Sequence, residues 1–182
     1  MKELLRCICY VLLTKQKKLQ FKLNKTDSIY IEAVCDLDYA GDVETRRSIS
    51  GFIVYVNGCP IAWRSRQQKT VSLSSCESKY YAITEAAQEL LYLLQLFKFL
   101  DIEVELPMVI RCNNQGAIFL AKNKSSTRTK HVDVRYHFIR DLVEQGIIRL
   151  EYINTKVNVA DMLTKNLPTE QIEKLIQDLF VV

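Results

Sequence analysis

Hydrophobic and polar positions in the first half of the chain predict three successive β-strands. Residues 28–34 alternate between the two classes, and 29–36, 49–56 and 59–66 are rich in β-branched, aromatic and other apolar residues. Asn57 and Gly58 separate the last two runs, and an Asn-Gly pair between apolar runs is typical of a tight hairpin turn. We therefore expect the domain to open with three antiparallel strands.

The second half of the chain predicts helices that alternate with short strands. Helical spacing of apolar residues from 75 to about 100 predicts a long helix, with Glu77 in its capped first turn. The continuous apolar run 108–112 suits a buried central strand. The remaining predicted elements are helices at 114–123 and 131–145, a strand at 147–153, and a last helical segment that begins at 158–163 and that Pro168 breaks or restarts.

The predicted order βββαβααβα indicates an α/β fold with a five-stranded mixed sheet. Strands separated by helices should be parallel neighbours, whereas the opening hairpins are antiparallel. Ahead of this domain, residues 3–14 predict a short amphipathic helix, followed by a lysine-rich stretch to residue 25. We expect two parts, an N-terminal segment 1–25 and a domain 26–182, with the helix either packed on the domain or belonging to a longer element.

Composition excludes several classes of protein. The chain of 182 residues is 48% hydrophobic with only 5 Gly and 3 Pro, which is typical of a folded domain. Its net charge of +4 permits nucleic-acid binding without predicting it. Six Cys without CxxC spacing and two His disfavour a zinc site, and predict free thiols in a reducing compartment. Because no apolar run approaches about 18 residues, we expect an intracellular protein without a membrane span.

Candidate chemistry lies at the ends of the predicted elements. Asp36 ends the first strand within the acidic run 35–42, and Glu77, Asn113 and Asp161 stand at the edges of later elements. The predicted sheet brings Asp36 and Asn113 to the ends of adjacent strands, with the other two approaching the same end. Converging carboxylates suit Mg²⁺ or Mn²⁺, and two such ions promote phosphodiester hydrolysis. A lone Asp at a strand end is more often a turn residue, so the set is more informative than any member.

Four stretches of the chain match the ordered motifs of one family closely. They are CDLDYAGDVETRRSISGFIVYVNGCPIAWRSRQQKTVSLSSCESKYYAI, RCNNQGAI, TRTKHVDVRYHFIRDLV and NVADMLTK. Together they resemble the RNase H domain at the end of the Pol polyprotein of copia-type LTR retrotransposons, from about residue 29 to about 170. Residues 5–21 resemble the last segment of that family's reverse transcriptase. The chain is therefore expected to be a C-terminal piece of a polyprotein that starts at an internal Met.

The resemblance implies a ribonuclease that cleaves the RNA strand of RNA–DNA hybrids, leaving 5′-phosphate and 3′-hydroxyl ends. It assigns Asp36, Glu77 and Asp161 as ligands of two Mg²⁺ (or Mn²⁺) ions. The fourth family ligand is an Asp, and here that position is Asn113. Because Asn is neutral and cannot bridge two cations, we expect weakened metal binding and severely impaired catalysis on an intact fold.

The expected partners are an RNA–DNA hybrid and the reverse transcriptase of the parent polyprotein, with no membrane. The residues expected to contact the hybrid are Arg64, Arg66, Lys69, Ser74 and Lys130. Ordinary solvated charge is the alternative interpretation of these side chains. His131 and His137 are candidates for proton transfer, although the helical context of His137 favours a structural role. Trp63 is expected in the core. The protein is expected in the cytoplasm, in a virus-like particle of the parent element, or in the nucleus.

Two other functions compete with an active nuclease. Integrases and transposases share the fold, but that class carries its Glu on a helix after the fourth strand, whereas Glu77 opens the first long helix. This disfavours the integrase interpretation. The second alternative is a catalytically inactive domain, either a hybrid-binding module or a relic, which Asn113 favours. Hybrid binding without cleavage would indicate the module, and absence of binding the relic.

Overall fold

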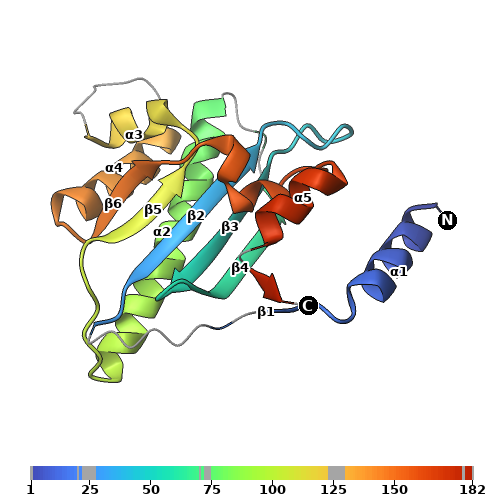
Figure 1. Cartoon of the computed structure of the whole chain (residues 1–182). Coiled ribbons are helices and arrows are strands. Elements are labelled where there is room, and N and C mark those ends of the chain that lie inside the picture. The colour runs from blue at the N-terminus through green and yellow to red at the C-terminus, as the bar shows by residue number, and fades with distance from the viewer. Residues whose placement is uncertain are drawn as a thin grey trace.

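A five-stranded mixed sheet lies at the centre of the computed structural model, which describes residues 2–19, 21, 28–69, 71, 75–122, 130–177 and 179–181. The strand order is β4-β3-β2-β5-β6 (Figure 1). The strands are β2 (Ile31–Asp38), β3 (Ile49–Val56), β4 (Cys59–Gln67), β5 (Met108–Cys112) and β6 (Ile148–Tyr152). β2, β3 and β4 pair antiparallel, whereas β2, β5 and β6 pair parallel. The predicted mixed sheet of an α/β fold is confirmed.

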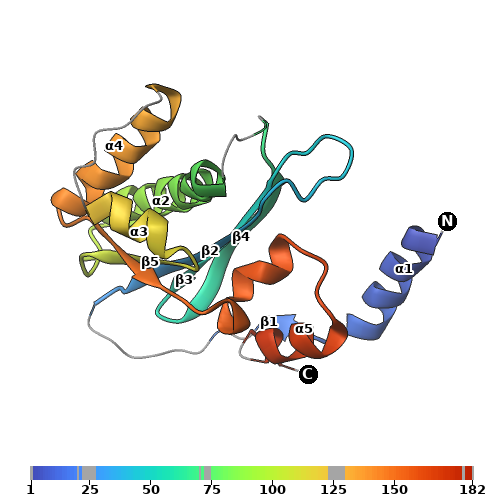
Figure 2. The same cartoon turned by 90° about the horizontal axis from the view of Figure 1, so that it is seen from above.

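Helices cover the two faces of this sheet unequally (Figure 2). The larger layer contains α2 (Ser75–Phe99), α3 (Gln115–Lys122) and α4 (Lys130–Glu144). The other face carries the 3₁₀ turns η1 (Thr155–Val157) and η2 (Val159–Leu163) and the helix α5 (Thr169–Ile176). The main core lies under α2, where alternate residues of β2 such as Ile31, Ala33 and Cys35 are buried. The intervening Val34 belongs to a smaller apolar cluster on the η2 side, so successive β2 side chains serve different faces.

The N-terminal segment meets the C-terminus. Helix α1 (Lys2–Thr14) forms as predicted, but its large apolar side chains are exposed. After it, β1 (Lys18–Leu19) pairs antiparallel with β7 (Phe180–Val181), a ladder that the sequence did not predict. The expected boundary at residue 25 lies outside the described residues. Within the described part of the chain, no helix is long and apolar enough to cross a membrane.

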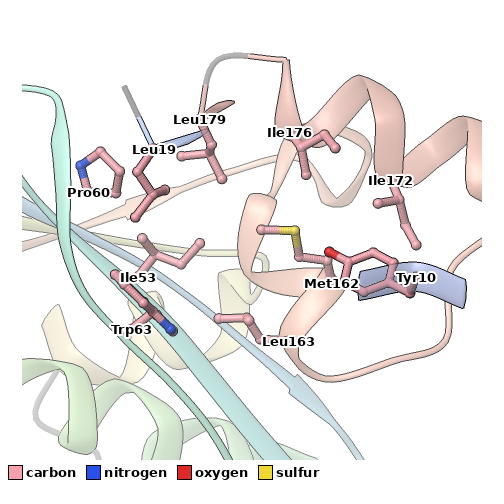
Figure 3. Close-up of a pocket in the computed structure, with 10 residues that line it drawn as sticks. All are labelled: Tyr10, Leu19, Ile53, Pro60, Trp63, Met162, Leu163, Ile172, Ile176 and Leu179. Carbon is pink, nitrogen blue, oxygen red and sulfur yellow. The ribbon is translucent and has the colours of Figure 1, made fainter. Parts of the chain in front are cut away.

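Trp63 is not in the core, contrary to expectation. It lies on the edge strand β4 and is 57% exposed. Figure 3 shows it among the side chains that line an apolar cavity between the sheet and the C-terminal segment. The volume of this cavity is about 420 Å³. The other lining residues are Tyr10, Leu19, Ile53, Pro60, Met162, Leu163, Ile172, Ile176 and Leu179. Apolar residues do alternate along β4, as the sequence suggested. However, β4 is an edge strand, and the sheet face that carries Trp63, opposite α2, is only partly covered there.

Gly51 allows η2 to approach the sheet closely. It sits in β3 directly opposite Asp36 of β2. A Cβ at this position would lie 2.8 Å from the Leu163 Cβ and 3.0 Å from the Thr164 Cγ2. Contacts this short would force the backbone of η2 away from the sheet. The glycine therefore sets the distance between β3 and η2.

We predict that Gly51→Ala destabilises the fold by about 1–3 kcal/mol, because the added methyl group overpacks the contact with η2. Urea unfolding followed by circular dichroism measures the loss. Gly116→Ala is the matched control: it lies in α3, where Ala is the better helix former, and the closest atom to its Cβ would be the Asn114 Oδ1 at 3.3 Å. Equal stability of the Gly51 variant and the unmodified chain would contradict a tight η2 contact.

Candidate active site

The pairing of β2 with β5 positions the first two candidate residues. Cys35 is in parallel register with Cys112, the last residue of β5. Asp36 and Asn113 follow directly and lie side by side, and the Asn113 Nδ2 donates a hydrogen bond to the Asp36 Oδ1 at 2.9 Å. This adjacency confirms the prediction from the strand order. Asn113 Nδ2 also lies 3.3 Å from the Thr155 Oγ1.

Asp161 reaches the same place from η2, which is tied to β2 by Asn158. The buried Asn158 side chain donates to the Cys35 carbonyl oxygen at 3.1 Å and accepts from the Ala160 N–H at 3.1 Å. It therefore caps η2 and fixes it to the central strand. At the other end of η2, the Thr164 hydroxyl donates to the Asp36 Oδ2 at 2.6 Å. Both Asp36 oxygens thus accept hydrogen bonds from neighbouring segments.

Lys165 forms an ion pair with each of the two aspartates. Its Nζ lies 3.2 Å from the Asp36 Oδ2 and 3.0 Å from the Asp161 Oδ2. The side chains of Asp36 and Asp161 are 0% and 1% exposed, whereas that of Lys165 is 29% exposed. Two buried carboxylates are costly to desolvate without a counter-charge, and the ammonium supplies one. We call Asp36, Asn113, Asp161, Thr164 and Lys165 the Asp36 cluster.

The cluster perturbs the ionisation of its members. Burial, and then the charge of Asp36, raise the pKa of Asp161 from 3.8 to about 6, although Lys165 acts in the opposite direction. Burial also opposes the charged form of Lys165, but the hydrogen bond to Asp161 and the charge of Asp36 outweigh it and raise the lysine pKa. Because the folded pKa of Asp161 exceeds its ordinary value, this residue's contribution to stability falls as the pH rises from about 4 to about 6.

The residues present do not fit the two metal ions that the family resemblance implies. The Asp161 Oδ1 is buried without a hydrogen-bond partner, an oxygen that could still face a cation. However, Lys165 already lies between the paired carboxylates, and Asn113 presents an N–H to Asp36. Within the described residues, no group of three or more His, Cys, Asp or Glu side chains is placed to hold a metal. The pair suits one cation at most.

Glu77 does not complete a metal-binding group with this pair. It lies in the first turn of α2, on the helical layer opposite η2, and is partly buried. Ser78 fixes that turn: its hydroxyl is 3.2 Å from the Ser48 Oγ, and its carbonyl accepts from the Gln68 Nε2 at 3.1 Å. Thus the structure joins Asp36, Asn113 and Asp161 but does not form a three-carboxylate group with Glu77.

Sequence reasoning missed Thr164 and Lys165. The only local signal was the spacing of Asp161 and Lys165, which are four residues apart and can therefore meet across one turn. That spacing is common on helix surfaces. Nothing in it indicates that the same ammonium also reaches Asp36 on a distant strand.

Only some of the residues expected to contact nucleic acid lie near one another. The Arg64 guanidinium lies 5.5 Å from the centre of the Phe52 ring and 3.9 Å from Glu85 of α2. It therefore occupies the α2 side of the edge strand, and Arg66 shares that side by alternation. Arg66 and Lys69 are exposed. Ser74 lies outside the described residues, as do the side chains of Lys130 and His131, whereas His137 is exposed on α4.

The charges around Asp161 predict opposite effects of two substitutions on its pKa. In the metal-free chain the Asp161 carboxyl should titrate at about 6. Lys165→Met should raise that pKa because the ammonium favours the ionised form, and Asp36→Asn should lower it by removing a like charge. Carboxyl ¹³C NMR measures all three chains. A midpoint near 3.8 in the unmodified chain, or shifts of the same sign, would contradict this geometry.

Comparison with known proteins places the chain among retroelement sequences. No family model matches it. It is 39% identical over 144 residues to the retrovirus-related Pol polyprotein from transposon TNT 1-94 of Nicotiana tabacum. It is 38% identical over 146 residues to that from transposon RE2 of Arabidopsis thaliana. These matches cover 79% and 80% of this chain but only 11% and 10% of the relatives, so the chain spans about a tenth of their length.

Solved structures show the same fold at low sequence identity. LC11-RNase H1, crystallised in complex with an RNA/DNA hybrid, aligns with a TM-score of 0.55 and 15% identity, covering 81% of this chain and 99% of that one. The N-terminal RNase H domain of rv2228c from Mycobacterium tuberculosis aligns with a TM-score of 0.53 and 11% identity, covering 81% and 97%. The chain has an RNase H-like fold and is similar in sequence to a segment of the retrovirus-related Pol polyproteins of plant transposons.

Proposed function

We propose that this chain is a retrotransposon-derived RNase H-like domain that binds RNA–DNA hybrids and hydrolyses their RNA strand poorly. The observation that carries the proposal is the 2.9 Å hydrogen bond from the Asn113 Nδ2 to the Asp36 Oδ1. In the family resemblance, position 113 provides a carboxylate ligand. Here it provides an N–H that donates to Asp36, whereas a carboxylate would present an anionic oxygen for a cation.

An amide at position 113 removes both a charge and a binding site for a cation. An Asp at this distance from Asp36 would repel it unless a cation or a proton lay between them. Asn113 needs neither, because a charge-assisted N–H···O⁻ bond already satisfies Asp36. A cation that binds Asp36 through this oxygen would first have to displace the amide. The substitution therefore favours the metal-free form of the Asp36 cluster.

Hybrid binding is proposed on separate grounds. The LC11-RNase H1 structure contains an RNA/DNA hybrid, and this chain has the same fold. The side chains of Arg66 and Lys69 are exposed near the end of β4, and Arg64 is partly exposed beside them. Arg and Lys contacts to phosphates position nucleic acid without reading its bases, so such binding needs no intact metal site. A non-catalytic binding module or a relic remains the competing function.

Restoring the carboxylate should restore hydrolysis. We predict that Asn113→Asp increases cleavage of a labelled RNA–DNA hybrid by about a hundredfold or more in Mg²⁺ or Mn²⁺. Asn114→Asp is the matched control, since it adds the same charge one residue away, at a side chain that accepts from the Gly116 N–H. Asp caps a helix as well as Asn does, so this control should fold normally and cleave no faster than the unmodified chain.

One further variant and one binding measurement make the result interpretable. Asp36→Asn combined with Asn113→Asp should abolish any restored cleavage. Hybrid binding of the unmodified chain, measured by fluorescence anisotropy in EDTA at several salt concentrations, separates the module from the relic. Strong cleavage by the unmodified chain would exclude the proposed impairment, and absence of hybrid binding would favour the relic.

A further inference from the structure

We propose that Lys165 is a built-in cation of the Asp36–Asp161 pair, which a divalent ion must displace before it can bind there. This inference rests on the proposed function only in taking the pair as the place where a cation acts. Its basis is the position of the Lys165 Nζ, 3.2 Å from the Asp36 Oδ2 and 3.0 Å from the Asp161 Oδ2. One ammonium thus bridges a strand residue and a residue of η2.

The backbone holds Lys165 at this position. Its N–H donates to the Asp161 carbonyl oxygen at 3.1 Å, which keeps the two residues on one turn at the end of η2. Within the described residues, the ion pairs made by Asp36 and Asp161 both come from Lys165. The remaining contacts of Asp36, from Thr164 and Asn113, are hydrogen bonds from neutral groups. Lys165 is therefore the positive charge in direct contact with the pair.

The ammonium can leave without a change of backbone. The Lys165 side chain is 29% exposed, although both carboxylates it contacts are buried. A lysine has a flexible four-carbon stem and a strongly hydrated ammonium, so rotation of the side chain can move the charge into water. The lysine is thus anchored at its backbone and free to exchange at its tip.

Loss of the lysine should make the pair more attractive to a divalent ion. When both carboxyl groups are ionised, the two carboxylates and one ammonium carry a net charge of −1, whereas the carboxylates alone carry −2. The Asp161 Oδ1, which is buried without a hydrogen-bond partner, remains as a free oxygen in either case. Replacing Lys165 by Met retains the apolar stem while removing the competing charge, so it tests the charge and not the packing.

The experiment measures Mn²⁺ binding to the full chain by electron paramagnetic resonance and isothermal titration calorimetry. Lys165→Met should bind Mn²⁺ about tenfold more tightly than the unmodified chain, because no cation has to be displaced. Without metal, the same variant should melt at a lower temperature, and saturating Mn²⁺ should recover the difference. Lys165→Arg retains the charge and should bind Mn²⁺ as the unmodified chain does.

Lys156→Met is the matched control. Lys156 is an exposed lysine of η1, nine residues before Lys165, and its removal changes the net charge of the chain equally. It should leave Mn²⁺ affinity unchanged. Tighter binding in this variant as well as in Lys165→Met would indicate a general effect of charge and would overturn the proposal.

A second measurement does not depend on any variant folding. In the unmodified chain, ¹⁵N NMR of the lysine side-chain ammonium should show the Lys165 signal move to that of a solvated lysine as Mg²⁺ saturates the pair. A Lys165 signal that stays unchanged at saturation overturns the proposal, as does equal Mn²⁺ affinity of Lys165→Met and the unmodified chain. Absence of Mn²⁺ binding in both chains overturns it too. Hybrid binding in EDTA does not depend on any of these metal-binding results. The hybrid binding in the proposed function is therefore tested separately from the role of Lys165.

Discussion

The buried carboxylate of Asp36 is the constraint on which this structure depends. Its side chain is fully buried in the central strand, where an unpaired charge would destabilise the fold by several kcal/mol. Three residues from two neighbouring segments therefore supply donors to it: Asn113 after β5, and Thr164 and Lys165 after η2. The strand pairing, the close approach at Gly51 and the η2 turn all serve to bring these groups together.

Under the proposed function, this arrangement places stability and metal-dependent chemistry in opposition at the site. A cluster satisfied by an amide, a hydroxyl and an ammonium is stable without a metal, because each buried polar group of the Asp36 cluster except the Asp161 Oδ1 has a partner. A site ready for two cations would instead hold repelling carboxylates close together and be strained until the ions bind. Functional sites often carry such strain. Asn113 moves the cluster toward the stable arrangement.

The sequence was sufficient for the parts of the fold that local pattern determines. The strands 49–56 and 108–112 were predicted to the residue, and the strand order then placed Asn113 beside Asp36. The roles of Thr164 and Lys165 could not be predicted, because they depend on how closely a 3₁₀ turn approaches a distant strand. Local pattern also misplaced Trp63, since alternation does not reveal that an edge strand lacks full cover on one face.

The two faces of the sheet separate the chemistry proposed here. Asp36 shares its face with Val34 and η2, whereas Arg64 packs over Phe52 toward Glu85 of α2. Among the described residues, no hydrogen bond or ion pair joins Arg64 to the Asp36 cluster, and both Arg66 and Lys69 are exposed. A change of charge at position 113 therefore disturbs no direct contact of these basic side chains. Under the proposed function, this separation allows a chain to retain its affinity for nucleic acid after its hydrolytic centre has changed.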